Sequence, residues 1–508
     1  MENKKKVYPI DELATQIEAL RKDGKRIVQC HGCFDLLHAG HLKHFETAKK
    51  EGDILVVTVT SDRFVNKGPG RPVFPHQIRA ETLAALDLVD FVAVCDSPSA
   101  VHAIELLRPD VYVKGKNYAD KCNDVTTNTF EEKQAVEQYG GRMFFTLETV
   151  FGSSSLLNQY FELYPREVQL FLEDFRKRYS AEDVLRALEG IRGLKVLVVG
   201  DAVVDEYHYV SPMGRTSKSN IVASRFLSDE SFAGGIFACA NHVAGFCDDV
   251  HLVTCLGLRD TKEGYIRQNL KSNVKTSFVY RSDCPTTVKR RYVDRLNLSK
   301  LFEVYFFEDA PMPDETEDQL VATLEKLLPE YDVVISLDYA HGFLSQRTIN
   351  LIVERSKFLA VNTQTNAANI GYNPVVKYPR ADYVCIDEPE LRLATRDRFG
   401  AIEPLLTSVV EKLQSPKGVV TRGHNGCLVT EAGKGLTHIP VMSQKIVDTV
   451  GAGDAFLAIT APCVASGLPM ELVGFIGNAV GAKAVTIVGN RESVEPIPLI
   501  QTIKAIMA

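Results

Sequence analysis

Residues 32–41 read Gly-Cys-Phe-Asp-Leu-Leu-His-Ala-Gly-His, and they join the apolar run 27–30 to a segment with apolar residues at helical spacing. The apolar run predicts a buried strand and the spacing predicts a helix, so the stretch forms a strand-to-helix turn. The first turn of a helix offers unpaired backbone N–H groups and a positive dipole end, which together favour phosphate. The stretch therefore predicts an α/β fold with an anion site at this turn.

The same alternation of strand and helix continues along the chain. Further strand-like runs lie at residues 54–59, 91–94, 111–113 and 143–147. Such alternation predicts a parallel sheet covered by helices on both faces. At 508 residues the chain is too long for a single core. We expect a first domain over residues 1–160, a helical connector over 161–192 and a second domain over 193–508, where the alternation starts again.

A second strand-to-helix turn, residues 448–456, reads Asp-Thr-Val-Gly-Ala-Gly-Asp-Ala-Phe. Its small residues permit a tight turn whose N–H groups surround an anion. Asp454 in that turn can take the proton from a hydroxyl that attacks a γ-phosphate. A plain Asp N-cap explains a bare Gly-x-Gly-Asp, but the full string is much rarer by chance.

The first turn carries its own chemistry. Gly40 lets the backbone approach a phosphate, and His38 and His41, three residues apart, can donate hydrogen bonds to one phosphate chain. Lys43, near the same helix start, can balance the charge of a leaving pyrophosphate. The four residues 38–41 alone leave open a pair of histidines that cap a helix or bind a metal.

Composition narrows the classes of ligand. The net charge is −7, so any anion site is local and no nucleic-acid surface is indicated. The eleven cysteines are odd in number and scattered, which favours free thiols in a reducing cytoplasm. No secretory signal follows the basic start, and no apolar run approaches the length of a membrane span. We expect a cytoplasmic protein that binds small molecules and neither nucleic acid nor membrane.

Residues 32–41, with the motifs that follow, resemble the cytidylyltransferase-like superfamily of nucleotidyltransferases over residues 25–160. The resemblance is strong to the adenylyltransferase half of ADP-heptose synthase, through 67–72 and 113–115. It implies a Rossmann-like domain, with His38, His41 and Lys43 catalytic. It also implies nucleotide contacts from Cys33, Phe34, Asp35, Gly40, Lys67, Arg71, Lys114, Gly115, Ser153, Ser154 and Ser155. The Arg-Thr-x-Gly-Ile-Ser-Thr string of polyol-phosphate cytidylyltransferases is absent, and ATP and CTP both stay open as the nucleotide.

The turn 448–456 resembles the signature of the ribokinase-like sugar kinase family, and supporting motifs extend the resemblance over residues 193–495. It implies an α/β/α domain with a small antiparallel β lid, and Asp454 as catalytic base. Implied ATP contacts are Thr421, Gly423, Gly426, Gly451, Ala452, Gly453 and Asn478. Implied sugar contacts are Asp201, Asp205, Gly234, Gly235, Asn241, Lys289 and Asp338. The implied metal ligands are Asp387 and Glu390 for Mg²⁺ through water, and Asp448 for a monovalent cation such as K⁺.

Three departures from the kinase pattern lie mostly on the sugar side. The Asn of the family's Asn-x-x-Glu is Asp387, the Lys of its Asp-Tyr-Gly-Lys-Gly is His341, and residues 234–238 lack the sugar-contacting Asn. These changes indicate an active kinase with an altered acceptor. The amide-rich stretch 362–373 fits an ordinary loop with self-capping side chains, or the lining of a polyhydroxylated ligand site.

Together the two halves predict a bifunctional sugar-activating enzyme: a kinase that phosphorylates a sugar or sugar phosphate at C1, and a nucleotidyltransferase that then makes a nucleotide sugar. Mg²⁺ is expected in both steps, and the resemblance implies a homodimer. The domain order is reversed relative to ADP-heptose synthase, where the kinase comes first. Two alternatives stay open. In one the kinase-like half is a ligand-sensing or dimerisation module, and in the other the first half acts on a polyol phosphate.

Overall fold

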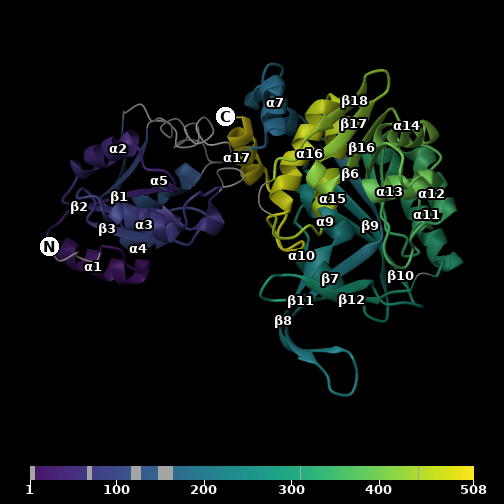
Figure 1. Ribbon diagram of the computed structural model, residues 1–508, viewed down its shortest axis with the longest axis horizontal. Coiled ribbons are helices and arrows are strands. Elements are labelled where there is room, and N and C mark those ends of the chain that lie inside the picture. Colours follow the sequence, from purple (N-terminus) through teal and green to yellow (C-terminus); the bar gives the residue numbers. More distant parts are fainter. Residues whose placement is uncertain are drawn as a thin grey trace. The chain divides into compact units, whose positions relative to one another are not determined.

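The computed structural model describes residues 6–65, 71–115, 128–146, 164–308, 310–443 and 446–507. The chain divides into two compact units, residues 1–163 and 164–507 (Figure 1). Each unit has its own sheet and its own buried core. No helix of the described residues is long and apolar enough to cross a membrane.

The first unit is a parallel sheet with helices on both faces. Its strands are β1 (Ile27–Gly32), β2 (Ile54–Thr60), β3 (Phe91–Cys95), β4 (Val111–Gly115) and β5 (Arg142–Thr146). Its helices are α1 (Ile10–Lys22), α2 (Ala39–Lys49), α3 (His76–Ala84), α4 (Val101–Leu107) and α5 (Asn128–Gln138). Buried side chains of α2 and α3 pack on one face of the sheet, and those of α1 and α4 pack on the other. The predicted α/β architecture is confirmed here.

The strand order of this sheet is β3-β2-β1-β4-β5, and all neighbouring strands run parallel. The chain moves outward from β1 to one side through β2 and β3, then crosses to the other side through β4 and β5. In open α/β sheets, ligands bind beyond the carboxyl ends of the strands where the order reverses in this way. The turn between β1 and α2 lies at that place.

The second unit is built on a nine-stranded sheet of order β10-β9-β6-β13-β14-β15-β16-β17-β18. The strands are β6 (Lys195–Gly200), β9 (Asp249–Gly257), β10 (Val274–Arg281), β13 (Val333–Asp338), β14 (Leu359–Thr363), β15 (Tyr383–Asp387), β16 (Lys417–Thr421), β17 (Cys427–Glu431) and β18 (Gly435–Ile439). Neighbours from β10 to β16 run parallel, and β17 and β18 are added antiparallel. The carboxyl ends of seven parallel strands therefore meet along one edge.

Helices cover both faces of this sheet (Figure 1). One layer contains α7 (Arg166–Phe175), α8 (Ala181–Gly190), α9 (Gly235–Ala244), α15 (Ala452–Ala465), α16 (Met470–Ala484) and α17 (Pro496–Met507). The other contains α11 (Asp314–Leu327), α12 (Gln346–Arg355), α13 (Glu388–Thr395) and α14 (Ile402–Lys412). A short helix, α10 (Glu263–Asn269), precedes β10. The helices of segment 161–192 thus pack in the core of the second unit, through buried residues such as Leu172, Phe175 and Leu188.

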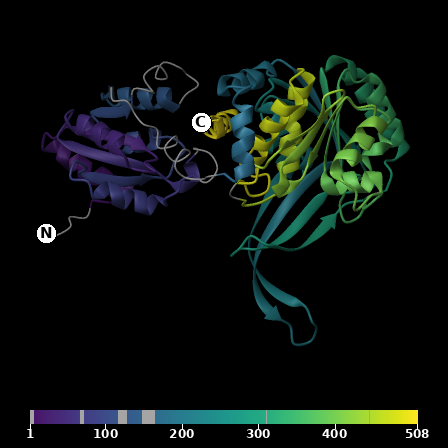
Figure 2. The same ribbon diagram turned by 45° about the horizontal axis from the view of Figure 1, so that its top comes forward.

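A separate four-stranded sheet of order β12-β11-β7-β8 forms the expected lid. Its strands are β7 (Ala202–Arg215), β8 (Val222–Gly234), β11 (Val288–Asp294) and β12 (Lys300–Phe306). The outer pairs are antiparallel, but β11 pairs with β7 in parallel, so the sheet is mixed. Parallel pairing is possible because the chain passes through α9 to β10 before it returns as β11. Figure 2 shows the long β7–β8 hairpin projecting from the unit.

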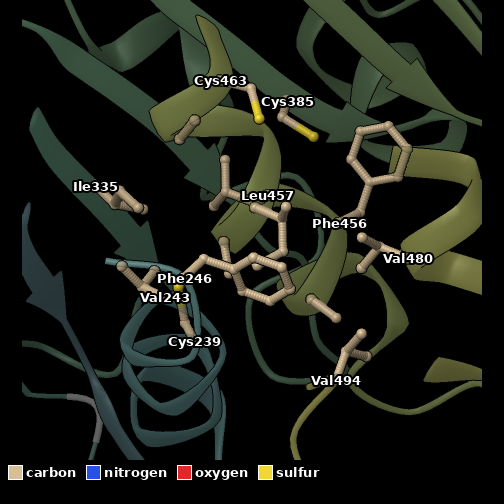
Figure 3. Close-up of a cluster of buried hydrophobic side chains, with 14 of the residues drawn as sticks. Cys239, Val243, Phe246, Ile335, Cys385, Phe456, Leu457, Cys463, Val480 and Val494 are labelled. Atoms are coloured by element: carbon tan, nitrogen blue, oxygen red, sulfur yellow. The ribbon is translucent and has the colours of Figure 1, made fainter. Parts of the chain in front are cut away.

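The core of the second unit fixes α15, which carries the second predicted turn at its start. Residues 454–464 of α15 are all buried, as expected for a helix that is apolar on every side. Figure 3 shows Leu457 of α15, Val243 of α9 and Ile335 of β13 in one apolar cluster. The N-terminus of α15 is therefore held against the carboxyl edge of the sheet.

Candidate active sites

The first site is the start of α2, where His38 and His41 lie side by side. His38 is the N-cap residue, and its Nδ1 accepts a hydrogen bond from the Gly40 backbone N–H at 3.1 Å. This contact leaves Nε2 as the donor nitrogen of a neutral ring. The two ring centroids are 4.0 Å apart, with the planes inclined by 33°. Two imidazoles at the positive end of a helix suit an anionic ligand.

Asp35 ties the first turn to the segment after the basic loop. Its Oδ1 accepts from the backbone N–H groups of Val73 at 2.8 Å and Phe74 at 3.0 Å. The Arg71 guanidinium lies 3.3 Å from its Oδ2, and both side chains are almost fully buried. The structure therefore brings together two elements of the predicted nucleotide site, although Asp35 and Arg71 face each other. Lys67, predicted in the same loop, lies outside the described residues.

The buried Arg79 side chain links the segments that surround this turn. The residue is only 2% exposed. Its guanidinium donates to the carbonyls of Cys33, Thr60 and Phe74 and to the carboxylate of Asp62. Because these groups belong to the turn after β1, the end of β2 and the segment before α3, Arg79 fixes their relative positions. Its burial makes it a structural residue of the site.

The end of β4 supplies Lys114 and Gly115 next to β1, since Cys30 pairs with Val113. Lys114 forms an ion pair of 2.7 Å with Glu132 of α5, whose side chain is 3% exposed. Two other predicted residues of this site, Phe34 and Lys43, have different surroundings. Phe34 packs its ring against His41, with centroids 5.4 Å apart, and Lys43 is exposed on α2. The predicted residues Ser153, Ser154 and Ser155 lie outside the described part of the chain.

The second site is a cleft of about 300 Å³ at the carboxyl edge of the large sheet. The lid contributes side chains from β7 and β11, and the core contributes residues from the ends of β14, β15 and β16 and from the α15 turn. Nine predicted residues line it: Asp205, Gly235, Lys289, Asp387, Glu390, Thr421, Gly451, Gly453 and Asp454. The structure therefore gathers residues that lie up to 249 positions apart, from Asp205 to Asp454.

Asp454 lies in the first turn of α15 and is 7% exposed. Its Oδ1 accepts from the Tyr339 hydroxyl at 2.9 Å and from the Gln364 amide at 2.7 Å. Burial raises the Asp454 pKa to about 6, and the two hydrogen bonds oppose that rise. Both donors use Oδ1, so Oδ2 stays available to accept a proton from a ligand. The carboxyl group is thus mostly ionised at neutral pH and poised as a base.

The turn before α15 depends on Gly451, which has φ 79°. A Cβ atom at this position would lie 2.1 Å from Oδ1 of Asn490, so a side chain is excluded by space as well as by conformation. The Ala452 N–H donates to the Thr449 carbonyl, and the next residues of the first turn of α15, Gly453 and Asp454, line the cleft. This is the geometry of an anion site at a helix N-terminus.

Asp387 and Glu390 are acidic neighbours at the start of α13. They form a capping box: Asp387 accepts from the Glu390 N–H at 2.8 Å, and Glu390 accepts from the Asp387 N–H at 3.0 Å. Burial and the nearby Asp387 charge raise the Glu390 pKa to about 8, and burial also raises the Asp387 pKa. Glu390 is therefore largely protonated at neutral pH until a cation binds nearby. A hydrated Mg²⁺, which takes one or two carboxylates and completes its shell with water and phosphate oxygens, would favour the ionised pair.

The acceptor side of the cleft is charged. Asp205 forms an ion pair with Arg291, and both line the cleft. Lys289 is 8% exposed, and its ammonium lies over the rings of Tyr305 and Tyr339. Desolvation lowers the Lys289 pKa. The predicted residues Asp205 and Lys289 thus lie in the cleft together with Arg291, which also pairs with Glu303 at 3.1 Å.

Several residues that were predicted to contact the ligand instead make contacts within the protein. Asp201 accepts from the backbone N–H groups of residues 339, 341 and 343 and so shapes the loop after β13. Asp338 is paired with Lys377 at 2.6 Å. Gly234 lies so close to Asp205 that a Cβ atom would be 2.0 Å from its carboxylate. These residues do not line the cleft themselves, but they position the segments that do.

Four further predicted residues lie away from the cleft lining, together with Ala452 in the turn itself. The Asn241 side-chain amide donates to the carbonyl of Asn269 and accepts from the N–H of Lys271. Asn478 donates to the Cys427 sulfur and to the carbonyl of Gly474 in its own helix. Gly423 and Gly426 belong to the turn between β16 and β17, at φ 53° and 75°.

The amide-rich stretch divides between its two expected roles. Asn366 and Asn369 accept from backbone N–H groups of residues 368 and 366, as in a self-capping loop. Asn366, Asn369 and Asn373 also donate to backbone carbonyls of residues 338 and 339, outside the stretch. Asn362 and Gln364 line the cleft instead.

Sequence reasoning missed Gln364, Arg291 and Asn490 as site residues. Gln364 lies inside the amide-rich stretch and Arg291 lies two residues after the predicted Lys289, but nothing local marks Asn490.

Comparison with known proteins places the second unit in a family. Residues 194–497, more than half of the chain, match the model described as pfkB family carbohydrate kinase. The chain belongs to the pfkB carbohydrate kinase family. Residues 29–187 match the model described as cytidylyltransferase-like. Both resemblances inferred from the two turns are confirmed.

Curated relatives of this pfkB protein include proteins named Bifunctional protein HldE. The one from Syntrophotalea carbinolica is 41% identical over 145 residues, 28% of this chain and 28% of that protein. The one from Geotalea uraniireducens is 44% identical over 140 residues, 27% of each. The chain thus matches little more than a quarter of the length of these relatives.

Among solved structures, phosphofructokinase-2 from Escherichia coli in complex with potassium aligns with a TM-score of 0.51 at 14% identity. The alignment covers 62% of this chain and 99% of that one. The tetrameric inhibited form of the same enzyme aligns with a TM-score of 0.50 at 13% identity. These TM-scores show that the second unit shares the fold of that enzyme.

Proposed function

We propose that the chain is a bifunctional sugar-activating enzyme. The pfkB unit transfers the γ-phosphate of ATP to a sugar or sugar phosphate, at the anomeric hydroxyl. The first unit then lets the 1-phosphate group of this product attack the α-phosphate of a nucleoside triphosphate, which releases pyrophosphate and leaves a nucleotide sugar that keeps any phosphate the acceptor brought. The observation that carries the proposal is Asp454, a buried carboxylate beside an anion turn in a cleft that is open to ligand.

In the kinase step Asp454 accepts the proton of the acceptor hydroxyl through Oδ2. Tyr339 and Gln364 hold the carboxylate through Oδ1, so its orientation is fixed before the acceptor binds. The N–H groups that open α15 stabilise the negative charge on the transferred phosphoryl group. Mg²⁺ held through water by Asp387 and Glu390 would neutralise phosphate oxygens of ATP.

The acceptor side supports an anionic acceptor. Lys289 is buried, and the described residues record no ion pair for its ammonium. A buried unpaired cation is unfavourable, so an acceptor that brings a phosphate would stabilise this side of the cleft. A sugar phosphate fits this requirement better than a neutral sugar.

In the nucleotidyl step His38 and His41 donate to the triphosphate at the start of α2, and the exposed Lys43 can follow the leaving pyrophosphate. Mg²⁺ is also expected here, because both reactants are phosphates. The resemblance to the adenylyltransferase half of ADP-heptose synthase favours ATP as the nucleotide. CTP remains the second candidate.

A screen of acceptors tests this proposal. The full chain is incubated with a panel of sugars and sugar phosphates, with ATP or CTP, and the products are identified by mass spectrometry. We expect a nucleotide-linked sugar from at least one sugar phosphate. In Asp454→Asn, ADP formation should stop, while an added sugar 1-phosphate should still yield the nucleotide sugar. Unchanged ADP formation in Asp454→Asn would show that the pfkB unit is not a kinase of this type.

We also propose that the chain forms a homodimer and works in the cytoplasm. Phe302, Val304 and Phe306 alternate along β12 and therefore share one face, where they are 57%, 39% and 41% exposed. A second copy would cover this apolar face. The ten described cysteines are all free thiols, which supports a reducing compartment. Light scattering of wild type and Phe302→Asp tests the dimer, which the charge should dissociate.

A further inference from the structure

Asp448 was expected to help bind a monovalent cation, but its carboxylate is already filled with donors. It is 8% exposed and precedes the anion turn. Oδ2 accepts from the Tyr207 hydroxyl at 2.7 Å and from the Gly489 N–H at 2.9 Å. Oδ1 accepts from the Lys300 ammonium at 2.7 Å and from the Val450 N–H at 3.1 Å.

These contacts leave no place for a metal ion on this carboxylate. An ionised carboxylate has about four lone-pair positions, and here four donors use them. A K⁺ ion needs oxygen lone pairs, whereas an ammonium group and N–H groups supply only hydrogens. The donor set at Asp448 therefore does not fit a cation, because a positive charge already lies there.

We infer that Lys300 is a built-in cation that takes the place of a monovalent ion at Asp448 and positions the anion turn of the kinase cleft. Lys300 is the first residue of β12 in the lid, and Asp448 lies three residues before Gly451. Tyr207 of β7 reaches the same carboxylate. The pair therefore links two lid strands to the turn that faces the phosphate.

A tethered cation has a different consequence from a free ion. A dissolved ion binds the turn whatever the lid does, whereas the Lys300 ammonium reaches Asp448 only while β12 lies against the core. The charge that orders the turn is thus present when the lid is in the position described here. The Val450 N–H donates to the same Oδ1, so the position of the Asp448 carboxylate fixes the backbone at the start of the turn.

Thermal unfolding in different salts tests the inference without any assay of turnover. Full-length wild type, Lys300→Ala and Lys300→Arg are melted in KCl and in choline chloride at equal ionic strength. We expect the wild-type Tm to be the same in both salts. In Lys300→Ala the vacated Oδ1 becomes a cation ligand, so its Tm should be at least about 2 °C higher in KCl than in choline chloride. Lys300→Arg should behave as wild type, because it restores a charged donor.

The control is Lys275→Ala, which removes a lysine from another ion pair of the same unit, with Asp249 at 2.8 Å. That variant should show no K⁺-specific shift. A K⁺-specific rise in the wild-type Tm, or no difference between the salts for Lys300→Ala, would overturn the inference.

A second readout rests on the proposed kinase activity. ADP formation by the wild type should be independent of K⁺, whereas Lys300→Ala should lose at least about tenfold in choline chloride and regain part of it in KCl. If neither protein forms ADP, the proposed kinase function fails while the melting result still decides the role of Lys300. Stimulation of the wild type by K⁺ contradicts the inference.

Discussion

The pH dependence of the kinase step in a Tyr339→Phe variant tests the role assigned to Asp454. The base must be ionised to accept a proton, and burial places the Asp454 pKa at about 6. The wild-type rate should therefore be level above neutrality and fall about tenfold for each pH unit below 6. The Tyr339 hydroxyl stabilises the ionised form from 2.9 Å, so its removal must raise this pKa.

The size of the shift follows from the contacts. A hydrogen bond to a charged group contributes about 1.5–3 kcal/mol, which corresponds to about one to two pKa units. Gln364 keeps its own bond to the same oxygen at 2.7 Å and offsets part of the loss. We expect the acid limb to move up by about one unit. At pH 6 the variant should be about fivefold slower than wild type, and at high pH the two should agree within about twofold.

The assay is ADP release measured across about pH 5 to 9 with a saturating acceptor. Tyr378→Phe is the matched control, because Tyr378 is also buried and donates its hydroxyl at 3.0 Å, but to Asp338. The control should keep the wild-type midpoint. An acid limb that stays in place in Tyr339→Phe, or moves equally in Tyr378→Phe, refutes the assignment of Asp454 as the base.

Three further predictions concern the same framework. Asp454→Asn should reduce kinase turnover about a hundred- to ten-thousandfold, yet raise stability. Its folded pKa of about 6 exceeds the ordinary aspartate value of 3.8, so wild-type stability increases as pH falls from 7 toward 4. Asn removes a penalty of up to about 3 kcal/mol at pH 7, measurable by calorimetry. Gly234→Ala should lower kinase turnover at least about tenfold, because its Cβ would lie 2.0 Å from Asp205, whereas Gly193→Ala, with open space around it, should be neutral. Arg79→Ala should destabilise the first unit by at least about 2 kcal/mol in urea titration, because buried carbonyls lose their donor, and a loss below about 0.5 kcal/mol would contradict its structural role.

The features that sequence predicted well are those fixed by local pattern. The five strands of the first unit appear where the strand-like runs lie, and both predicted turns lead into helices. Asp454 was identified because its neighbours in sequence already define an anion turn. In each case the physics that decides the structure acts within about ten residues.

The features that sequence could not supply are pairings between distant residues. Lys300 and Asp448 are 148 positions apart, and Gln364 and Asp454 are 90 apart. Neither side chain carries a local sign of its partner, so a free carboxylate and a paired one look alike in the sequence. The cation contact at Asp448 was implied by the family resemblance, which gives no sign of the Lys300 pairing.

Burial explains the remaining differences. Arg79 was not predicted to have a role, because nothing in the sequence shows that the fold directs it inward to backbone carbonyls. The helices of residues 166–190 carry charges as a connector would, but their apolar stripes are wide enough to join the core of the second unit. Which face of such a helix meets a partner depends on surfaces formed elsewhere in the chain.

Radiolabel transfer tests the central claim, that one chain breaks a triphosphate at two different phosphorus atoms. The full chain is given an acceptor from the screen with γ-labelled ATP, or with ATP or CTP labelled at the α position in the presence of unlabelled ATP, and Asp454→Asn and His41→Asn are compared with wild type. Wild type should place the γ label in a sugar phosphate and the α label in a nucleotide sugar. Asp454→Asn should lose only the γ transfer when sugar 1-phosphate is supplied, and His41→Asn only the α transfer. Loss of both transfers in a single folded variant, or transfer of only one label by wild type, would contradict two independent phosphate sites.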